Sequence, residues 1–260
     1  MYVRLFLVAF FYLMSFAAFA AGGEGACALP NAGEEIAEQG ITGNTELNED
    51  EKFKKAVSLE GQYWSERRGG GEIGQLSGKR TQNAAAYARA KMSVNDELLQ
   101  TDGNININVK YAQVKNESWI TTVSSEAPGE ANYRIDNIQK YMKKVEAEYA
   151  KVGNTLNDTT RKYITEYLQA NEAGGGDLLL NEVSGLPGMH AEVQAFNRIV
   201  NLAENEGVTL TEQELKKITI ATVRVSKEQA KTGADFVACP NCSGILNGAG
   251  VNIITDNLPD

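Results

Sequence analysis

Residues 190–225, HAEVQAFNRIVNLAENEGVTLTEQELKKITIATVRV, decide the fold class of this chain. The first half of this stretch repeats apolar side chains at helical spacing, so that one face carries Val193, Phe196, Ile199 and Ala203. The second half, over residues 218–225, is rich in β-branched side chains, which is typical of a central strand. A helix that leads into a buried strand predicts an α/β fold with helices packed against one sheet.

The same alternation of helix and strand continues on both sides of this stretch. Upstream, apolar spacing predicts helices over residues 133–153 and 157–173 and a short buried strand over 178–180. Downstream, residues 239–248 predict a short helix and residues 251–255 a last strand. We therefore expect an α/β domain in the C-terminal half of the chain.

This predicted domain occupies residues 131–260, and three different segments precede it. Residues 1–20 combine a positive start, a short apolar run and an A-x-A site, the pattern of a secretory signal peptide. Residues 21–60 are rich in Gly and Glu, which predicts an acidic linker or loosely ordered arm. Together these segments are expected to form a mixed, partly disordered N-terminal region, and residues 61–130 are the part whose fold is uncertain. Strands are expected there at 105–111 and 118–123. The chain is therefore expected to be exported, secreted or periplasmic, without stable membrane insertion after signal cleavage.

Composition and charge exclude several classes of protein. The 260 residues carry a formal net charge of -9, which argues against holding a long DNA duplex by counterion release. The single histidine excludes a site with two or more histidine ligands, and three cysteines exclude a disulfide-dense scaffold.

Two short motifs carry the candidate chemistry, His190-Ala191-Glu192 and Cys239-Pro240-Asn241-Cys242. Alone, a histidine at a helix start is usually a polar cap, and a C-x-x-C pair is open to zinc, redox or disulfide roles. Together, one imidazole and two thiolates suit Zn²⁺ and leave its fourth position open, as in catalytic zinc sites. With Cys239 as N-cap and Pro240 in the first helical position, both thiols can converge at the positive end of a helix dipole. Glu192 can face the same point from the first turn of its helix and exchange a proton there.

The longer strings around these motifs, residues 187–195 and 239–246, resemble the YwqJ-like deaminases of the zinc-dependent cytidine deaminase superfamily. The resemblance covers about residues 175–256. It implies a three-layer cytidine-deaminase-like fold. It also implies a zinc site formed by His190, Cys239 and Cys242, with Glu192 as the proton shuttle. It also implies hydrolytic loss of an exocyclic amine from a nucleobase, cytosine being the commonest choice in the superfamily. The acidic balance of the chain fits a nucleobase-containing substrate that is free or single-stranded better than a duplex. Members of this group commonly form C-terminal domains of secreted bacterial toxins, which implies an immunity protein as partner.

Two features depart from the superfamily pattern. Pro240 follows the first cysteine, whereas the pattern places a proline before it. Only one predicted strand follows the cysteine helix, so a five-stranded deaminase sheet needs its other strands from upstream.

Two other classes remain open from the sequence. An exported C-P-x-C motif is also typical of thiol–disulfide oxidoreductases, which would use the pair Cys239 and Cys242. A non-catalytic zinc-binding module is the third hypothesis. Glu192 discriminates among them, because it is essential for deamination, irrelevant to thiol exchange and nearly irrelevant to metal binding.

Overall fold

The computed structural model describes residues 47–70, 86–107, 109–124, 131–173, 179–225 and 232–255. The predicted signal peptide lies outside these ranges and stays a prediction. In the part of the chain that is described, none of the helices is long and apolar enough to span a bilayer.

The main sheet has five strands, in the order β2-β1-β7-β8, with β3 also pairing with β1. Their bounds are β1 Ala86–Val94, β2 Glu97–Gln100, β3 Asn104–Ile105, β7 Thr219–Arg224 and β8 Asn252–Ile253. Strands β1 and β7 are antiparallel, whereas β7 and β8 are parallel. The strand predicted over residues 218–225 is therefore central, and β1 and its neighbours are the strands that the sheet needed from upstream.

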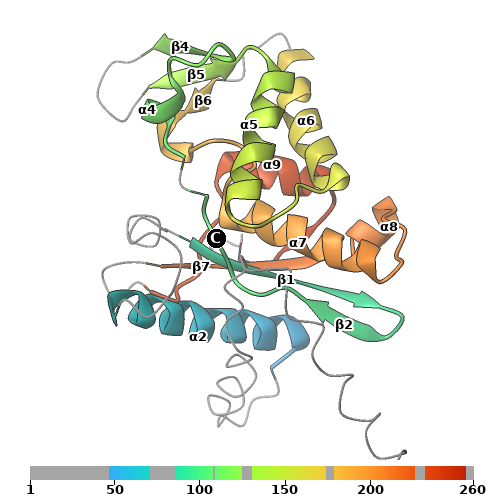
Figure 1. Ribbon diagram of the computed structural model, residues 1–260. Coiled ribbons are helices and arrows are strands. Elements are labelled where there is room, and N and C mark those ends of the chain that lie inside the picture. The colour runs from blue at the N-terminus through green and yellow to red at the C-terminus, as the bar shows by residue number, and fades with distance from the viewer. Residues whose placement is uncertain are drawn as a thin grey trace, which may run out of the picture.

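Helices cover both faces of this sheet (Figure 1). Helix α2, Glu49–Gly70, lies on one face, and α7, Ala191–Asn205, lies on the other. Because successive side chains of a strand point to opposite faces, Tyr87 of β1 packs with the α2 side and Ala88 with the α7 side. The result is a mixed α/β fold with the layers helix, sheet and helix.

Helix α2 corrects the expectation of a loosely ordered arm that extends to residue 60. Its acidic residues lie mainly in the first turn, where they favour a helix N-terminus, and its apolar side chains Phe53, Val57 and Trp64 are buried. Glu60 is also buried, where it accepts a hydrogen bond from the Tyr87 hydroxyl at 2.8 Å. The acidic composition therefore belongs, in the part of the arm that the structure describes, to a helix that docks on the sheet through a few apolar side chains.

A second, smaller sheet has the order β4-β5-β6 and lies at the far end of the helical layer (Figure 1). The remaining elements are α4 Tyr111–Val114, β4 Ile120–Ser124, β5 Asn132–Ile135, α5 Ile138–Lys151, α6 Asp158–Ala173, β6 Leu180–Asn181, η1 Glu182–Ser184, α8 Glu212–Leu215 and α9 Pro240–Gly248. The helix expected from residue 133 begins at Ile138, because the residues before it form β5. The strand expected over 105–111 ends at Ile105, since the next buried N–H, of Ile107, donates to the Met189 carbonyl.

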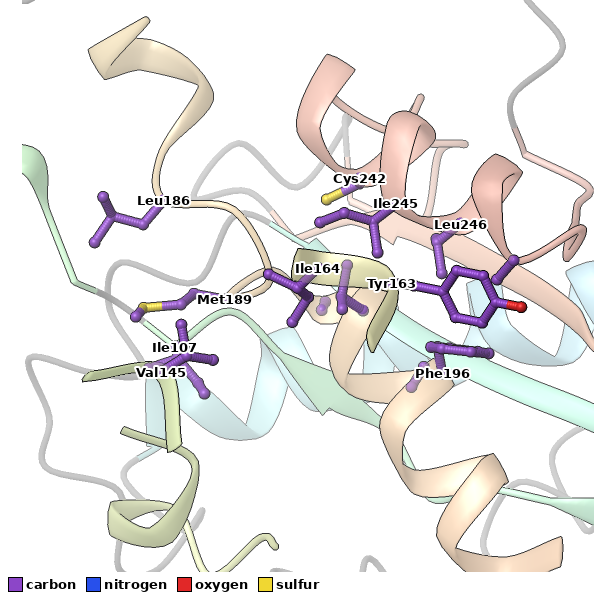
Figure 2. Close-up of a cluster of buried hydrophobic side chains, with 14 of the residues drawn as sticks. Ile107, Val145, Tyr163, Ile164, Leu186, Met189, Phe196, Cys242, Ile245 and Leu246 are labelled. Carbon is purple, nitrogen blue, oxygen red and sulfur yellow. The ribbon is translucent and has the colours of Figure 1, made fainter. Parts of the chain in front are cut away.

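One apolar core joins α6, α7 and α9 and extends to the loop before α7 (Figure 2). Figure 2 shows Tyr163 of α6 beside Phe196 of α7 and Leu246 of α9. Cys242 lies in the same cluster and is fully buried. This core holds the first turns of α7 and α9 in a defined relation to each other.

Candidate metal and catalytic site

The two predicted motifs lie at the N-termini of two neighbouring helices. His190 is the N-cap residue of α7, and Cys239 is the N-cap residue of α9 with Pro240 in the first turn. The first free N–H of α7, that of Ala191, donates to the side-chain oxygen of Asn106 at 2.9 Å. Because Asn106 supplies this cap, the imidazole of His190 turns toward the cysteines instead.

The structure brings His190, Cys239 and Cys242 together. The Nδ1 atom of His190 lies 3.2 Å from the Cys239 sulfur and 3.3 Å from the Cys242 sulfur, and the two sulfurs are 3.4 Å apart. In the described ranges, these three side chains form the group of potential metal ligands. Cys242 is buried, whereas His190 and Cys239 are partly exposed.

The geometry of this group fits a zinc ion. Ligand atoms about 2.1–2.3 Å from zinc at tetrahedral angles stand about 3.6–3.8 Å apart. The observed separations of 3.2–3.4 Å are within a few tenths of an ångström of that arrangement. An imidazole and two thiols are also ligands that zinc prefers, and three protein ligands leave one position for water or substrate.

The pKa values of the two thiols are shifted in opposite directions. The hydrogen bond from Cys242 lowers the pKa of Cys239 to about 4, and His190 adds to this effect despite burial. The same bond, together with burial, raises the pKa of Cys242 well above its usual range. The pKa of His190 is raised, because the contact with Cys239 outweighs the opposing effect of burial. The metal-free site is thus organised around a thiolate, the ligand form of cysteine.

Glu192 lies in the first turn of α7, next to the three-residue group. One carboxylate oxygen of Glu192 is 3.8 Å from the Cys242 sulfur, and the residue is 2% exposed. Burial raises the pKa of this carboxyl, although His190 acts to lower it. A buried carboxyl beside a metal-type site, held on a rigid helix, is suited to taking up and releasing a proton.

Sequence analysis missed the residues that support this group. Gly185, at φ +65°, lies against the far nitrogen of the His190 ring, since a Cβ there would be 2.4 Å from Nε2. The Tyr133 hydroxyl donates to the Gly185 carbonyl at 2.6 Å, and Asn241 Nδ2 donates to the same carbonyl at 3.2 Å. The glycine in S-G-L-P-G was a local signal for a turn, but its contact with His190 depends on the fold.

An α/β sheet with H-x-E at one helix start and C-x-x-C at another is the arrangement typical of deaminases. The sequence model of the YwqJ-like deaminase family matches residues 125–251, and this part of the chain belongs to that family.

A curated relative is the toxin subunit YenC2 of Yersinia entomophaga, which is 30% identical over 126 residues. The aligned segment is 48% of this chain and only 12% of the relative, so the similarity concerns a small part of that larger protein. No solved structure gives a significant match to the chain.

Proposed function

We propose that this chain is a zinc-dependent hydrolase that removes the exocyclic amine of a nucleobase, with cytosine as the first candidate. The observation that carries the proposal is the set of three donor atoms 3.2–3.4 Å apart with a buried carboxylate beside it. A purely structural zinc site usually has four protein ligands, whereas a catalytic site has three. The membership of residues 125–251 in a deaminase family supports the same chemistry.

The reaction consumes one water and releases ammonia, and it leaves a carbonyl where the amine stood. Zinc held by His190, Cys239 and Cys242 would act as a Lewis acid that lowers the pKa of a water molecule. Glu192 accepts the first water proton at its carboxylate and delivers it to the ring nitrogen as oxygen adds to the amine-bearing carbon. It then accepts the second proton, from the added hydroxyl, and delivers it to the amine, which leaves as ammonia. The first turn of α7 fixes this carboxylate, so it keeps its position through both transfers.

The test compares zinc content and ammonia release in three forms of the purified chain. Wild type and Glu192→Gln should each hold about one zinc, and Cys239→Ser should hold much less. Ammonia release from nucleosides, nucleotides and single-stranded oligonucleotides should fall about 10²- to 10⁴-fold in Glu192→Gln. The matched control is Glu206→Gln, an exposed position at the other end of α7, which should behave as wild type. A Glu192→Gln variant with undiminished ammonia release would refute the assigned role.

We further propose that the chain is an exported toxin that acts on its substrate inside a recipient cell and is neutralised by an immunity protein. The similarity to a toxin subunit supports this, as do the signal-like residues 1–20. Induced expression of the chain without residues 1–20 in a bacterial cytoplasm should stop growth, whereas Glu192→Gln should not. Unimpaired growth with active, soluble enzyme would contradict the toxin proposal and leave the deaminase proposal intact.

The alternative function is thiol–disulfide exchange. The pKa of about 4 at Cys239, with its partner sulfur 3.4 Å away, favours a reactive thiolate. This function needs neither His190 as a ligand nor Glu192 as a base. A wild-type protein without zinc, whose two thiols titrate as one disulfide, would favour it over deamination.

A further inference from the structure

Asn241 lies between the two candidate cysteine ligands and is itself almost completely buried, with 2% of its surface exposed. Its side-chain nitrogen donates to the Gly185 carbonyl at 3.2 Å and to the Ser184 carbonyl at 3.4 Å. Both carbonyls belong to the turn that leads to His190. Asn241 of the cysteine motif is thus hydrogen-bonded to the backbone of the turn that precedes His190.

The orientation of this amide is set by a neighbour from another helix. The hydroxyl of Tyr167, on α6, donates to the side-chain oxygen of Asn241 at 3.0 Å. The Tyr167 ring packs directly on α9, since a Cβ at Gly244 would lie 2.2 Å from it. With its oxygen engaged by Tyr167, the amide of Asn241 directs both of its N–H groups toward the turn.

The turn that Asn241 holds is in contact with the histidine ligand. Gly185 lies against the His190 ring on the side of Nε2, opposite to Nδ1, which faces the sulfurs. The Gly185 carbonyl receives a second hydrogen bond, from the Tyr133 hydroxyl. If the Gly185 peptide moved away from α9, the His190 ring would lose the contact that keeps Nδ1 close to the two sulfurs.

We propose that Asn241 is a positioning residue that couples the cysteine pair to His190 and so sets the geometry of the metal site. This inference rests on the zinc site proposed above. Residues that orient metal ligands typically change metal affinity about 10- to 100-fold when they are replaced. Asn241 is not proposed as a metal ligand, because its side chain hydrogen-bonds to Tyr167, Ser184 and Gly185.

The discriminating variant is Asn241→Asp. A carboxylate still accepts from Tyr167, but it turns both donated hydrogen bonds into contacts between oxygen atoms, which repel. Charge alone would make a carboxylate near a bound cation strengthen metal binding. The positioning role predicts the opposite, a loss of zinc affinity of about 10-fold or more.

The experiment measures zinc affinity by competition with a chromophoric chelator and records the absorption spectrum of the Co²⁺-loaded protein. Asn241→Asp should bind zinc more weakly and should shift the cobalt bands at full occupancy, because the ligands are displaced. Asn247→Ala is the matched control, since Asn247 lies on the same helix but is exposed. Tyr167→Phe is a second variant, which keeps the ring on α9 and removes only the hydroxyl, and it should shift the bands less.

A cobalt spectrum of Asn241→Asp and of Tyr167→Phe identical to that of wild type at full occupancy would overturn the positioning role. The wild-type arm reports separately on the site: a wild type that binds neither metal would overturn the zinc proposal itself. Unfolding of the metal-free variants by urea shows whether each variant is folded. If Asn241→Asp does not fold, the comparison of Tyr167→Phe with wild type decides the question.

Discussion

Replacing Gly185 by alanine tests how closely the backbone confines the histidine ligand. A Cβ at Gly185 would lie 2.4 Å from Nε2 of His190. Favourable contacts between heavy atoms begin at about 3.5 Å, so the ring must retreat by about 1 Å. Metal–ligand bonds tolerate deviations of about 0.2 Å. The substitution should therefore displace a ligand, and we expect zinc affinity to fall about 10-fold or more.

Gly207 provides a control with the same backbone conformation. It has φ +80°, and in the described part of the chain nothing would lie within 4 Å of an added Cβ. Alanine in the left-handed region costs about 1–2 kcal/mol at either position, and the clash with His190 adds to the loss of unfolding free energy at Gly185 alone. The assay is zinc competition together with urea unfolding of the metal-free proteins. Equal zinc affinities for Gly185→Ala and Gly207→Ala would refute the confinement of His190.

Two predictions concern stability away from the site. Burial acts to raise the pKa of Glu148, but hydrogen bonds from Lys151 and Lys144 outweigh it and lower the pKa. Its stabilising effect is thus present above the unfolded pKa of about 4.3 and is lost as pH falls through the folded pKa, so Glu148→Gln should destabilise at pH 7 and match wild type in acid. A constant difference in unfolding free energy from pH 7 to pH 3 would contradict this. Phe53→Ala should cost about 3–5 kcal/mol, because it removes a buried ring between α2 and the sheet, whereas exposed Lys52→Ala should cost less than about 1 kcal/mol in the same urea titration.

The helices and the central strand of the C-terminal half were predictable because their local patterns agree with their tertiary surroundings. The helix expected from His190 and the strand expected over 218–225 are both confirmed within one or two residues. Strand β1 was not predicted. Its alanines are weak strand formers, and its charged residues Arg89 and Lys91 gave it the pattern of a basic surface. In the fold, these charges pair with Glu60 and Asp50 of α2, which no local pattern reveals.

The same distinction holds within the site. The close approach of four side chains was predictable because their types and short spacings suggest a common site: His190, Glu192, Cys239 and Cys242. The groups that hold them act through hydrogen bonds to backbone carbonyls or through contact distance, as Asn241 and Gly185 do. Such interactions depend on which turn meets which helix, and a linear pattern contains no information about that meeting.

The site also depends on parts of the chain outside the segment that matches the family. Strand β7 lies between the helix that carries His190 and the helix that carries Cys239, and it pairs with β1 from Ala86–Arg224 to Lys91–Thr219. Helix α2 covers the other face of both strands, and at Gly61 the helix approaches so closely that a Cβ would lie 2.6 Å from Val223. Because β7 is buried on both faces and paired on both edges, its position, and with it the spacing of α7 and α9, depends on α2 and β1 as well as on residues 125–251. The folded unit that holds the candidate ligands together therefore includes α2, which lies well before the family match.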